Sequence, residues 1–360
     1  MKVCIIGDSL TSLALAKALV NREIFVDIFL KKKNIIVDTT RTIGISKSNI
    51  DYFNKNITNI NRLLWKIKKI KIYSENSEKD SIIQFKNQKD PLFSILKNHK
   101  LVNQLTLELK KNKFINFKKN TSGKHPAQAD YDLLINSDLT HKFTKKYFSK
   151  KFEKKYNSVA YTTIINHKKI SLNNTAVQIF TNKGPIAFLP ISNEKTSVVY
   201  SIRLKNFSND LEIKNMINKF NSFYEIKKIN EISKFELSSF NLREYYRGNI
   251  LAFGDLLHKL HPLAGQGFNM SIRDIKVLLE IIDSKISLGL PIDKNVCIEF
   301  QNKTKSKNFL FSNGIDLIYE LFNSENKIRN NLVDSTVKLF GKNKLVNRYF
   351  KSIADEGLQV

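Results

Sequence analysis

The N-terminal part of the chain combines short apolar runs with one helical stripe. Residues 3–6 are an unbroken apolar run, residues 10–20 place apolar side chains at helical spacing, and residues 24–30 are apolar apart from Asp27. Short unbroken runs are typical of buried strands, and apolar positions at steps of three and four are typical of a helix. The order strand, helix, strand predicts a parallel sheet and therefore an α/β fold.

The middle of the chain follows a different pattern. Residues 132–135 predict one more buried strand, whereas residues 150–250 contain alternating, aromatic-rich segments and one helical stripe near residues 211–223. Alternation with a period of two is typical of strands in an antiparallel sheet. A strand is predicted at residues 249–253, and the polar residues 285–360 are predicted to be mostly helical. We therefore expect a molecule that begins as α/β and is α+β overall.

A glycine follows the first predicted strand, at the place where dinucleotide-binding proteins have a phosphate-binding turn. Such turns use glycine at three positions: for the tight bend, for close approach of the phosphates and for helix packing. Here Gly7 stands at the first position, and Ser9 and Ser12 stand at the other two. Their backbone N–H groups would still face an anion at the start of the helix. An ordinary strand–turn–helix with serine caps explains the same residues, so both interpretations stay open.

Two acidic positions bear on the same turn. The second strand ends at Leu30, without the acid that binds the adenosine ribose in dinucleotide-binding folds, and Asp27 lies too early in that strand. The strand at residues 132–135 runs into a polar turn that contains Asp138. An acid in this place either caps the turn or contacts the sugar–phosphate part of a cofactor, and the sequence alone allows both.

The segment from residue 254 to residue 274 carries the most specific pattern. A glycine at the end of a strand permits close approach of a ligand, and the next residue, Asp255, can accept hydrogen bonds from hydroxyl groups. Pro262 fixes a rigid turn, and Gly265 and Gly267 let a helix begin directly against a ligand. The positive end of that helix would stabilise negative charge. The pattern predicts the ribityl and isoalloxazine end of a flavin site; a loop made only for packing is the alternative.

Residues 260–269, with Arg273 and Asp274 following, closely resemble the FAD-dependent hydroxylases of ubiquinone biosynthesis. These hydroxylases belong to the aromatic-ring monooxygenases similar to p-hydroxybenzoate hydroxylase. Residues 38–46, which include Arg41, resemble the segment of this family that lies along the flavin. Residues 180–190 resemble its substrate-domain signature, and Asp138 matches the acid of its second cofactor motif. The resemblance extends over nearly the whole chain.

The resemblance implies a Rossmann-like FAD-binding domain, an inserted antiparallel-sheet substrate domain and a helical C-terminal region. We place the discontinuous FAD-binding domain at residues 1–75, 97–150 and 249–285. We place the substrate domain at residues 76–96 and 151–248, and the helical region at residues 286–360.

The resemblance also implies the cofactor and its contacts. FAD, reduced by an external donor such as NAD(P)H, would activate O₂ for hydroxylation of an electron-rich phenol ring, so no catalytic residue is assigned beyond the flavin itself. The flavin-facing loop would comprise Pro262, Gly265, Gln266 and Gly267. The cofactor-binding residues are expected to be Gly7, Ser9, Ser12, Arg41, Asp138, Gly254, Asp255, Pro262, Gly265, Gly267, Phe268 and Asn269.

Several positions depart from the family pattern, chiefly where the ADP part of FAD would bind. Ser9 and Ser12 replace glycines, Leu30 or Lys31 replaces the ribose-binding acid, and Leu139 replaces the glycine usual after Asp138. The leading expectation is an FAD-dependent monooxygenase that hydroxylates a polyprenylated phenol in ubiquinone biosynthesis. The departures motivate an alternative, a catalytically degenerate member that is a scaffold in a biosynthetic complex. A flavin oxidoreductase of the same fold acting on another isoprenoid substrate is a further alternative.

Composition adds one unusual property, a net charge of +27 in a chain rich in Lys, Asn and Ile. An AT-rich genome produces such a composition, and a basic surface that contacts an anionic membrane is the alternative. Without zinc-finger spacing or an aromatic RNA-binding motif, we expect no nucleic-acid partner. No apolar run reaches the roughly 18 residues that span a bilayer. We expect a cytoplasmic protein, peripheral on the inner membrane, that takes its apolar substrate from the bilayer.

The cysteines and histidines predict no further chemistry. Cys4 and Cys297 are far apart and have no CxxC partner, which favours reduced thiols. The spacing of His258 and His261 does not make a zinc site without further ligands, so we expect no metal and a structural role for His258.

Overall fold

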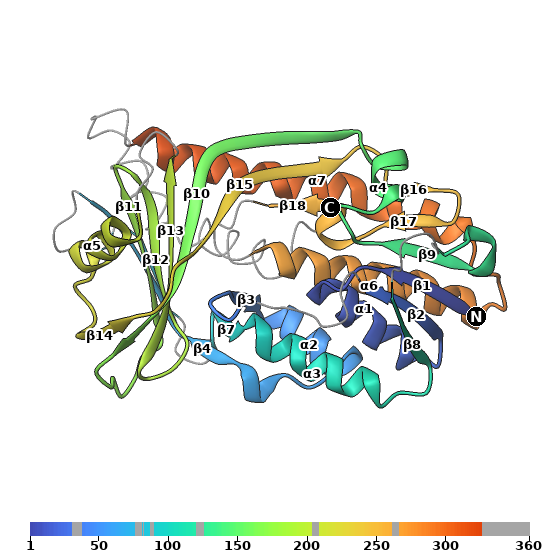
Figure 1. Cartoon of the computed structure of the whole chain (residues 1–360), viewed down its shortest axis with the longest axis horizontal. Helices are drawn as coiled ribbons and strands as arrows, with labels where there is room; N and C mark the ends of the chain where they lie inside the picture. Colours follow the sequence, from blue (N-terminus) through green and yellow to red (C-terminus); the bar gives the residue numbers. More distant parts are fainter. Residues whose placement is uncertain are drawn as a thin grey trace.

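The computed structural model describes residues 1–30, 38–75, 81, 83–86, 90–119, 126–203, 209–260 and 266–325. These residues form a mainly parallel sheet surrounded by helices, a large mainly antiparallel sheet, and a small third sheet between them (Figure 1). The structure confirms the prediction of a molecule that begins with an α/β unit and is α+β overall.

The first sheet has six strands in the order β16-β17-β9-β1-β2-β8. The neighbours from β17 to β8 run parallel, and β16 pairs antiparallel with β17 at the edge. The strands are β1 Lys2–Ile6, β2 Phe25–Leu30, β8 Ile115–Lys119, β9 Leu133–Asn136, β16 Tyr246–Arg247 and β17 Ile250–Ala252. Helix α1 (Leu10–Val20) connects β1 to its parallel neighbour β2, so the predicted βαβ unit is confirmed.

Helices pack around this sheet and share its apolar core. Val3 and Ile5 from β1, Leu13 from α1 and Ile275 from α6 are fully buried in one cluster. The remaining helices are α2 Lys47–Asn56, α3 Asn98–Lys110, α4 Lys142–Tyr147, α5 Asp210–Phe220, α6 Gln266–Ser287 and α7 Lys294–Glu325. Short 3₁₀ turns are η1 Asn61–Leu63, η2 Gln128–Asp130 and η4 Gly254–Leu256. None of the helices in the described ranges combines the length and apolarity needed to span a membrane.

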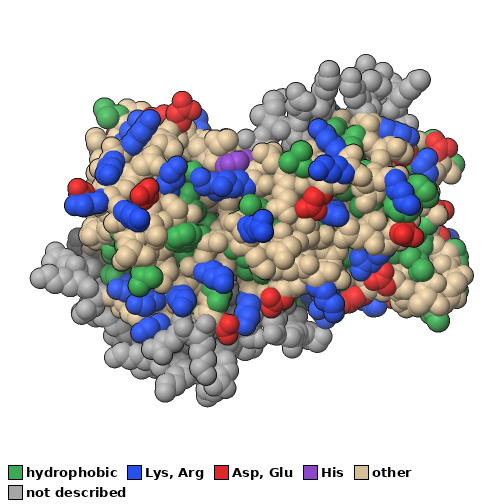
Figure 2. Space-filling model, turned by 90° about the horizontal axis from the view of Figure 1, so that it is seen from below, with side chains coloured by type: hydrophobic (Ala, Val, Ile, Leu, Met, Phe, Trp, Pro, Cys, Tyr) green, Lys and Arg blue, Asp and Glu red, His purple; other side chains and the backbone are tan. Residues whose placement is uncertain are grey.

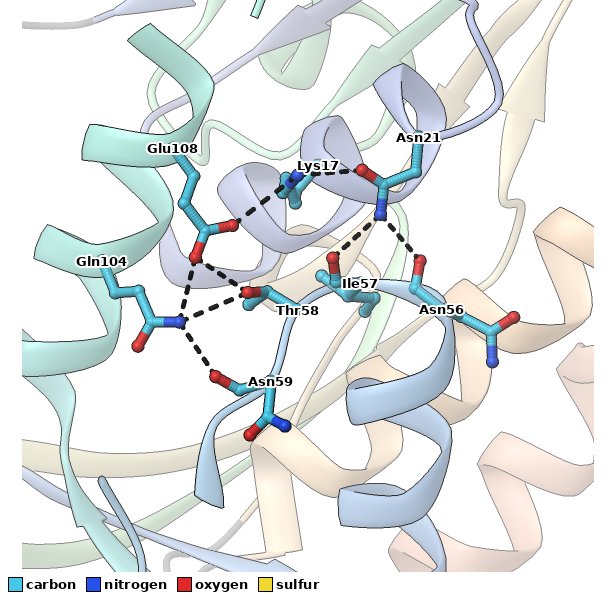
Figure 3. Close-up of polar contacts among 8 residues, drawn as sticks. All are labelled: Lys17, Asn21, Asn56, Ile57, Thr58, Asn59, Gln104 and Glu108. Carbon is cyan, nitrogen blue, oxygen red and sulfur yellow. Dashed lines mark hydrogen bonds and ion pairs between the residues drawn. The ribbon is translucent and has the colours of Figure 1, made fainter. Parts of the chain in front are cut away.

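A polar cluster fixes α3 against α1 and the segment that follows α2 (Figure 3). The Gln104 amide donates to the carbonyl of Asn59 at 3.0 Å, and the Thr58 hydroxyl donates to Glu108 at 2.8 Å. Lys17 of α1 lies 3.6 Å from the other carboxylate oxygen of Glu108. Side chains from two helices thus hold one connecting segment, and those of α3 come from its middle and C-terminal part.

The large sheet has nine strands: the order β18-β15-β10-β13-β12-β11-β5-β6, with β14 beside β10. Its strands are β5 Lys69–Ser74, β6 Ile83–Lys86, β10 Lys151–His167, β11 Thr175–Thr181, β12 Gly184–Pro190, β13 Lys195–Arg203, β14 Ile226–Ile229, β15 Ser233–Leu242 and β18 His258–Lys259. Most neighbours are antiparallel, but β5 pairs parallel with β11. The proposed domain bounds stay predictions, although this pairing joins β5 to the large sheet.

The two faces of the large sheet have different neighbours. Val198 and Tyr200 of β13 pack with Ile213 and Ile217 of α5 in a second apolar core. Because side chains alternate along a strand, Ser197 of the same strand points to the opposite face, toward the first sheet. The large sheet is therefore covered by α5 on one side and faces the parallel-sheet domain with the other.

The third sheet joins these two parts. Its strands are β3 Thr42–Ser46, β7 Phe93–Lys97 and β4 Trp65–Ile67, with β7 in the middle. The Thr42 hydroxyl donates to Ser197 of the large sheet at 3.0 Å. On the other side, the Asn269 amide of α6 donates to the carbonyl of Gly44 at 3.0 Å. The small sheet is thus hydrogen-bonded to both larger units.

Candidate functional site

The turn after β1 requires a glycine. Gly7 has φ +124°, a backbone conformation that L side chains rarely adopt, and a Cβ built on it would lie 2.3 Å from the Ser137 hydroxyl. The Gly7 N–H donates to the carbonyl of Phe29 at 3.0 Å, which fixes the turn to the end of β2. The chain can therefore leave β1 and enter α1 within a few residues only because position 7 lacks a side chain.

The two serines at the other glycine positions are held in a chain of hydroxyl groups. The Ser9 hydroxyl caps α1 by accepting from the Ser12 N–H at 3.2 Å, and it lies 2.9 Å from the Ser12 hydroxyl. The buried Ser12 hydroxyl lies 2.6 Å from that of Ser137, which donates to the carbonyl of Ile6 at 3.0 Å. Ser12 therefore fits at a packing position because Ser137, which was not predicted, gives its hydroxyl a partner.

Asp138 makes local contacts at the end of β9. Its carboxylate accepts from the N–H and the hydroxyl of Thr140, both at 2.8 Å, which is the pattern of a side chain that caps a turn. The Asp138 N–H donates to Asn136 at 3.2 Å, and Asp138 is only partly buried. The observed hydrogen bonds are those expected if Asp138 caps the turn. Contact between Asp138 and a cofactor stays a prediction.

The strand β17 brings a second glycine to the same edge of the sheet. Gly254 has φ +60°, and a Cβ on it would lie 3.1 Å from the methyl group of Thr11 in the first turn of α1. The next residue, Asp255, is exposed. The ends of β1, β9 and β17 therefore meet at one edge of the first sheet, where ligands of open α/β sheets bind. Ser137 and Thr11 were not among the predicted site residues, because only the folded sheet brings the ends of these strands together.

The helix α6 begins beside this edge. Pro262 and Gly265 lie outside the described residues, but the helix is described from Gln266 onwards. Within the described residues, nothing lies within 4 Å of a Cβ placed on Gly267, so the backbone is open to an approaching group. The Gln266 side-chain oxygen is buried and has no hydrogen-bond partner among the described residues. A buried amide oxygen without a partner is costly, and a bound ligand would satisfy it.

Phe268 and Asn269 fix the start of α6 to its neighbours. The Phe268 ring lies 6.2 Å from the ring of Phe53 in α2. The Asn269 side chain accepts from the N–H of Ser46 at 3.0 Å and donates to β3. These contacts hold the beginning of α6, and cofactor contact by either residue stays a prediction.

Arg41 lies between the first domain and the large sheet. Its carbonyl accepts from the N–H of Asn98 at 3.1 Å, and its side chain is exposed. The neighbouring Thr40 hydroxyl donates to Ser233 of the large sheet at 3.2 Å. Arg41 is therefore held by its backbone while its guanidinium is available to a ligand at the junction.

His258 belongs to a buried polar group that the sequence did not reveal. Its Nε2 lies 2.5 Å from a carboxylate oxygen of Asp274, and Asn308 of α7 donates to the other oxygen at 3.0 Å. His258 and Asp274 are almost completely buried. The group joins β18, α6 and α7, which supports the structural role expected for His258. Among the described residues, no group of three or more His, Cys, Asp or Glu could hold a metal ion.

Asp27 is also buried and serves the fold. Burial alone would raise the pKa of Asp27, but hydrogen bonds from Lys118, Tyr131 and Asn116 lower it to about 2. Lys118 and Tyr131 both donate to this carboxylate at 2.8 Å, and Lys2 lies 3.2 Å away. Its carboxylate is thus occupied within the sheet rather than presented to a nucleotide ribose.

The residues at the sheet edge fit a dinucleotide-type cofactor. Gly7 precedes the start of α1, and helix N-termini favour anions; Asp255 offers an exposed acceptor, and the backbone at Gly267 is open. The unpartnered Gln266 oxygen adds one buried polar group that a ligand could engage. These residues come from β1, β17 and α6, so the site is assembled from segments far apart in the sequence.

Comparison with known proteins finds similarity to FAD-dependent proteins over part of the chain. A family model described as an FAD binding domain matches residues 149–287, from the start of β10 to the end of α6. The chain is 30% identical over 158 residues to the 3-demethoxyubiquinol 3-hydroxylase of Escherichia coli (strain K12), which covers 41% of this chain and 39% of that protein. It is 24% identical over 210 residues to the ubiquinone biosynthesis monooxygenase COQ6 of Danio rerio, covering 47% and 43%. Over these stretches the chain is similar to FAD-binding proteins and to ubiquinone-biosynthesis monooxygenases.

Solved structures agree on the fold of this family. The p-nitrophenol 4-monooxygenase PnpA from Pseudomonas putida DLL-E4 superposes with a TM-score of 0.80 over 99% of this chain and 98% of its own, at 13% identity. HpxO from Klebsiella pneumoniae, complexed with FAD and uric acid, superposes with a TM-score of 0.65 at 14% identity, over 99% of this chain and 93% of its own. The match spans less than half the length of these two curated relatives.

Proposed function

We propose that the chain is an FAD-dependent monooxygenase that hydroxylates the aromatic ring of a polyprenylated phenol in ubiquinone biosynthesis. The family supports FAD and monooxygenase chemistry. The names of two relatives, a 3-demethoxyubiquinol 3-hydroxylase and a ubiquinone biosynthesis monooxygenase, support the substrate class. The proposal extends to NAD(P)H as the reductant and O₂ as the second substrate.

One observation carries the proposal: the ends of β1 and β17 and the start of α6 meet at one edge of the parallel sheet. Gly7, Gly254 and Gly267 each present backbone there without a side chain. A planar, phosphate-bearing cofactor needs protein backbone without side chains beside both its phosphates and its ring.

Each residue at this edge has a role in the proposal. The N–H groups at the start of α1 would hold the pyrophosphate, helped by the positive end of the helix. Asp255 would accept hydrogen bonds from the ribityl hydroxyls, and the start of α6 at Gln266 and Gly267 would face the flavin ring. FAD supplies the oxygen chemistry when bound, and the protein orients the ring and excludes water.

The large sheet supplies the wall on the substrate side. Ser197 and Thr162 on its inner face contact Thr42 and Thr40 of the first domain. Ala160 and Val199, in register beside them, are small. In this proposal a planar phenol would lie between this face and the flavin.

Bound flavin tests the proposal directly. Full-length protein purified without added cofactor, then mixed with FAD and desalted, is expected to show the flavin absorption bands at about one flavin per chain. Asp255→Ala is expected to lower the flavin content at equal protein stability, whereas Asp130→Ala, at an exposed position of η2, is expected to leave it unchanged. A wild-type protein that stays colourless would overturn the proposal.

The substrate class needs a separate test. A strain that lacks the gene is expected to accumulate a polyprenylated phenol with one hydroxyl group fewer than the wild-type product, detected by mass spectrometry of lipid extracts. Accumulation of a precursor with incomplete isoprenoid saturation instead would favour an oxidoreductase acting on an isoprenoid chain.

A scaffold without catalysis is the second candidate. The hydroxyl chain through Ser9, Ser12 and Ser137 favours this candidate, because the serines fill positions that glycine holds in dinucleotide-binding turns. Such a scaffold in a biosynthetic complex would not need the flavin site. Rescue of the deletion strain by Asp255→Ala as fully as by wild type, at equal protein levels, would favour the scaffold over the enzyme.

We also propose that the protein acts in the cytoplasm, peripheral on the inner membrane. A polyprenylated phenol is held in the bilayer, so an enzyme that hydroxylates it must approach the membrane surface. The net charge of +27 would attract it to anionic lipids.

A further inference from the structure

A basic cluster lies where the third sheet meets the large sheet. It consists of Arg41, Lys97, His99, Lys100 and Lys195, which come from the segment before β3, the end of β7, the start of α3 and the start of β13. Figure 2 shows many Lys and Arg side chains on the face seen from below. None of Lys97, His99, Lys100 and Lys195 has a role in the flavin site described above.

Backbone pairing brings these residues together. Lys97 stands opposite Thr42 in the ladder between β7 and β3, so both side chains share one face of the small sheet. The Thr42 hydroxyl reaches Ser197 of β13 at 3.0 Å, and Lys195 lies two residues earlier on the same face of that strand. Lys97 and Lys195 therefore approach each other across the junction of the two sheets.

The start of α3 adds the other members. The Asn98 N–H donates to the carbonyl of Arg41 at 3.1 Å, which places Arg41 beside His99 and Lys100. Burial lowers the pKa of Lys97, and the positive charges of Lys195 and Lys100 lower it further. Burial and the charges of Lys97 and Lys100 lower the pKa of His99 in the same way. The cations thus repel one another, and a bound anion would relieve that repulsion.

Two further observations indicate that the cluster is available to a ligand. The Nδ1 atom of His99 is buried and has no hydrogen-bond partner among the described residues. Asp38, the acid that faces the cluster, is already engaged by the N–H and hydroxyl of Thr40 at 2.8 Å and 2.7 Å. Asp38 is a single carboxylate beside four cationic side chains, so it offsets only part of the positive charge, and the imidazole can still bond to an incoming group.

The cluster lies close to the start of α6. The Gly44 carbonyl accepts from Asn269 of α6 at 3.0 Å, and Thr42 is two residues earlier in β3. Two residues of a strand span about 7 Å, so the basic cluster is roughly that far along β3 from the helix expected to face the flavin. A ligand anchored at the cluster can therefore extend to the flavin end of the site.

We propose that the basic cluster binds a phosphate group of the nicotinamide dinucleotide that reduces the flavin. The inference rests on the proposed function, because it assigns the anion to the reductant of that same site. Lys97 and Lys195 supply charge from the two sheets, His99 supplies a hydrogen bond, and Arg41 and Lys100 complete the cationic surface. A nicotinamide dinucleotide carries phosphate at two places. The pyrophosphate is common to NADH and NADPH, and the 2′-phosphate is present only in NADPH.

Calorimetry with the full chain tests this site without requiring turnover. The probes are inorganic pyrophosphate, ADP-ribose and its 2′-phosphate. Lys97→Gln and Lys195→Gln are each expected to raise the Kd for ADP-ribose or its 2′-phosphate by about five- to twentyfold, because each removes one charge-assisted hydrogen bond. Lys97→Arg retains the charge and is expected to stay within about threefold of wild type. Lys110→Gln is the matched control, because Lys110 is exposed at the C-terminal end of α3, whereas Lys97 precedes its start. This variant is expected to change Kd less than about twofold.

The outcomes separate the two proposals. A preference for the 2′-phosphate that disappears in the Gln variants assigns the cluster to that group, and an equal loss for all three probes assigns it to the pyrophosphate. Normal flavin content with unchanged Kd values in both Gln variants would overturn the inference and leave the monooxygenase proposal intact. Wild-type protein that binds ADP-ribose but no flavin would overturn the monooxygenase proposal instead.

Discussion

At the residue scale, glycines decide where the chain can bend beside the proposed cofactor. Gly7 combines φ +124° with a neighbouring hydroxyl 2.3 Å from a virtual Cβ, so both the backbone and the space forbid a side chain. Gly314 in α7 is the opposite case, because a Cβ there would meet nothing within 4 Å among the described residues. The same residue type therefore has opposite consequences at the two positions.

Gly7→Ala is expected to destabilise the protein by about 2 kcal/mol and to reduce its flavin content, because strained φ values cost about 1–3 kcal/mol. Gly314→Ala is the control and is expected to stabilise it by roughly 0.5–1 kcal/mol, since alanine is the better helix former. Urea unfolding followed by circular dichroism measures both. A Gly7→Ala variant as stable as wild type would contradict the interpretation of this turn.

At the scale of elements, buried polar groups connect strands and helices that periodicity cannot place together. Asp274 of α6 accepts from Asn308 of α7 and contacts His258 of β18, all within the core. On the same helix, Asp283 pairs with Arg22 at 2.6 Å but is half exposed. The two acids of one helix thus offer a matched comparison of a buried and a surface contact.

Asp274→Ala is expected to lower the free energy of unfolding by about 3 kcal/mol, because it leaves His258 and Asn308 buried without their partner. Asp274→Asn keeps the shape and an acceptor for Asn308, so a smaller loss is expected. Asp283→Ala is expected to cost at most about 1 kcal/mol, as for an exposed ion pair. Equal losses at positions 274 and 283 in chemical denaturation would refute the ranking.

The strands β1, β2 and β8 share the buried carboxylate of Asp27, and this predicts an acid-sensitive stability. Because the folded pKa of about 2 lies below the ordinary value of 3.8, the contribution is present above about pH 4 and is lost as the pH falls toward 2. The lost stability would be about 2 kcal/mol. Asp27→Asn should flatten this part of the curve of unfolding free energy against pH, and an unchanged slope would argue against the assignment.

At the scale of the whole molecule, the features to consider are the distribution of surface charge and the contacts between the two larger units. The face seen in Figure 2 carries Lys and Arg side chains spread over many elements, with fewer acids between them. The two larger units meet through short hydroxyl contacts such as Thr42 with Ser197 and Thr40 with Ser233. The basic cluster lies along this junction, and the proposed flavin site extends toward it.

The net charge of +27 is expected to bind the protein to vesicles that contain anionic lipids, with binding lost when salt is raised to about 0.5 M. Flotation with anionic and with neutral vesicles measures this. Binding that is indifferent to lipid charge and to salt would contradict an electrostatic attachment.

The sequence by itself determined the local elements and much of the chemistry. Unbroken apolar runs indicated β1 and β2, the stripe between them indicated α1, and the glycine-rich segment after β17 indicated the family. These signals are local, since each depends on residues within a few turns of one another. Gly7, Gly254 and Gly267 were therefore found before their positions were known.

Only the tertiary structure decided which of these segments meet. Ser137 stands 125 residues from the Ser12 hydroxyl that it contacts, and Thr42 stands 155 residues from Ser197. The buried carboxylate of Asp27 accepts from Tyr131, which stands 104 residues away, and no local pattern indicated this partner. Strand order and domain contact follow from the burial of whole faces, which no local pattern encodes. Hence the flavin motif was readable in the sequence, whereas the basic cluster beside it exists only after folding.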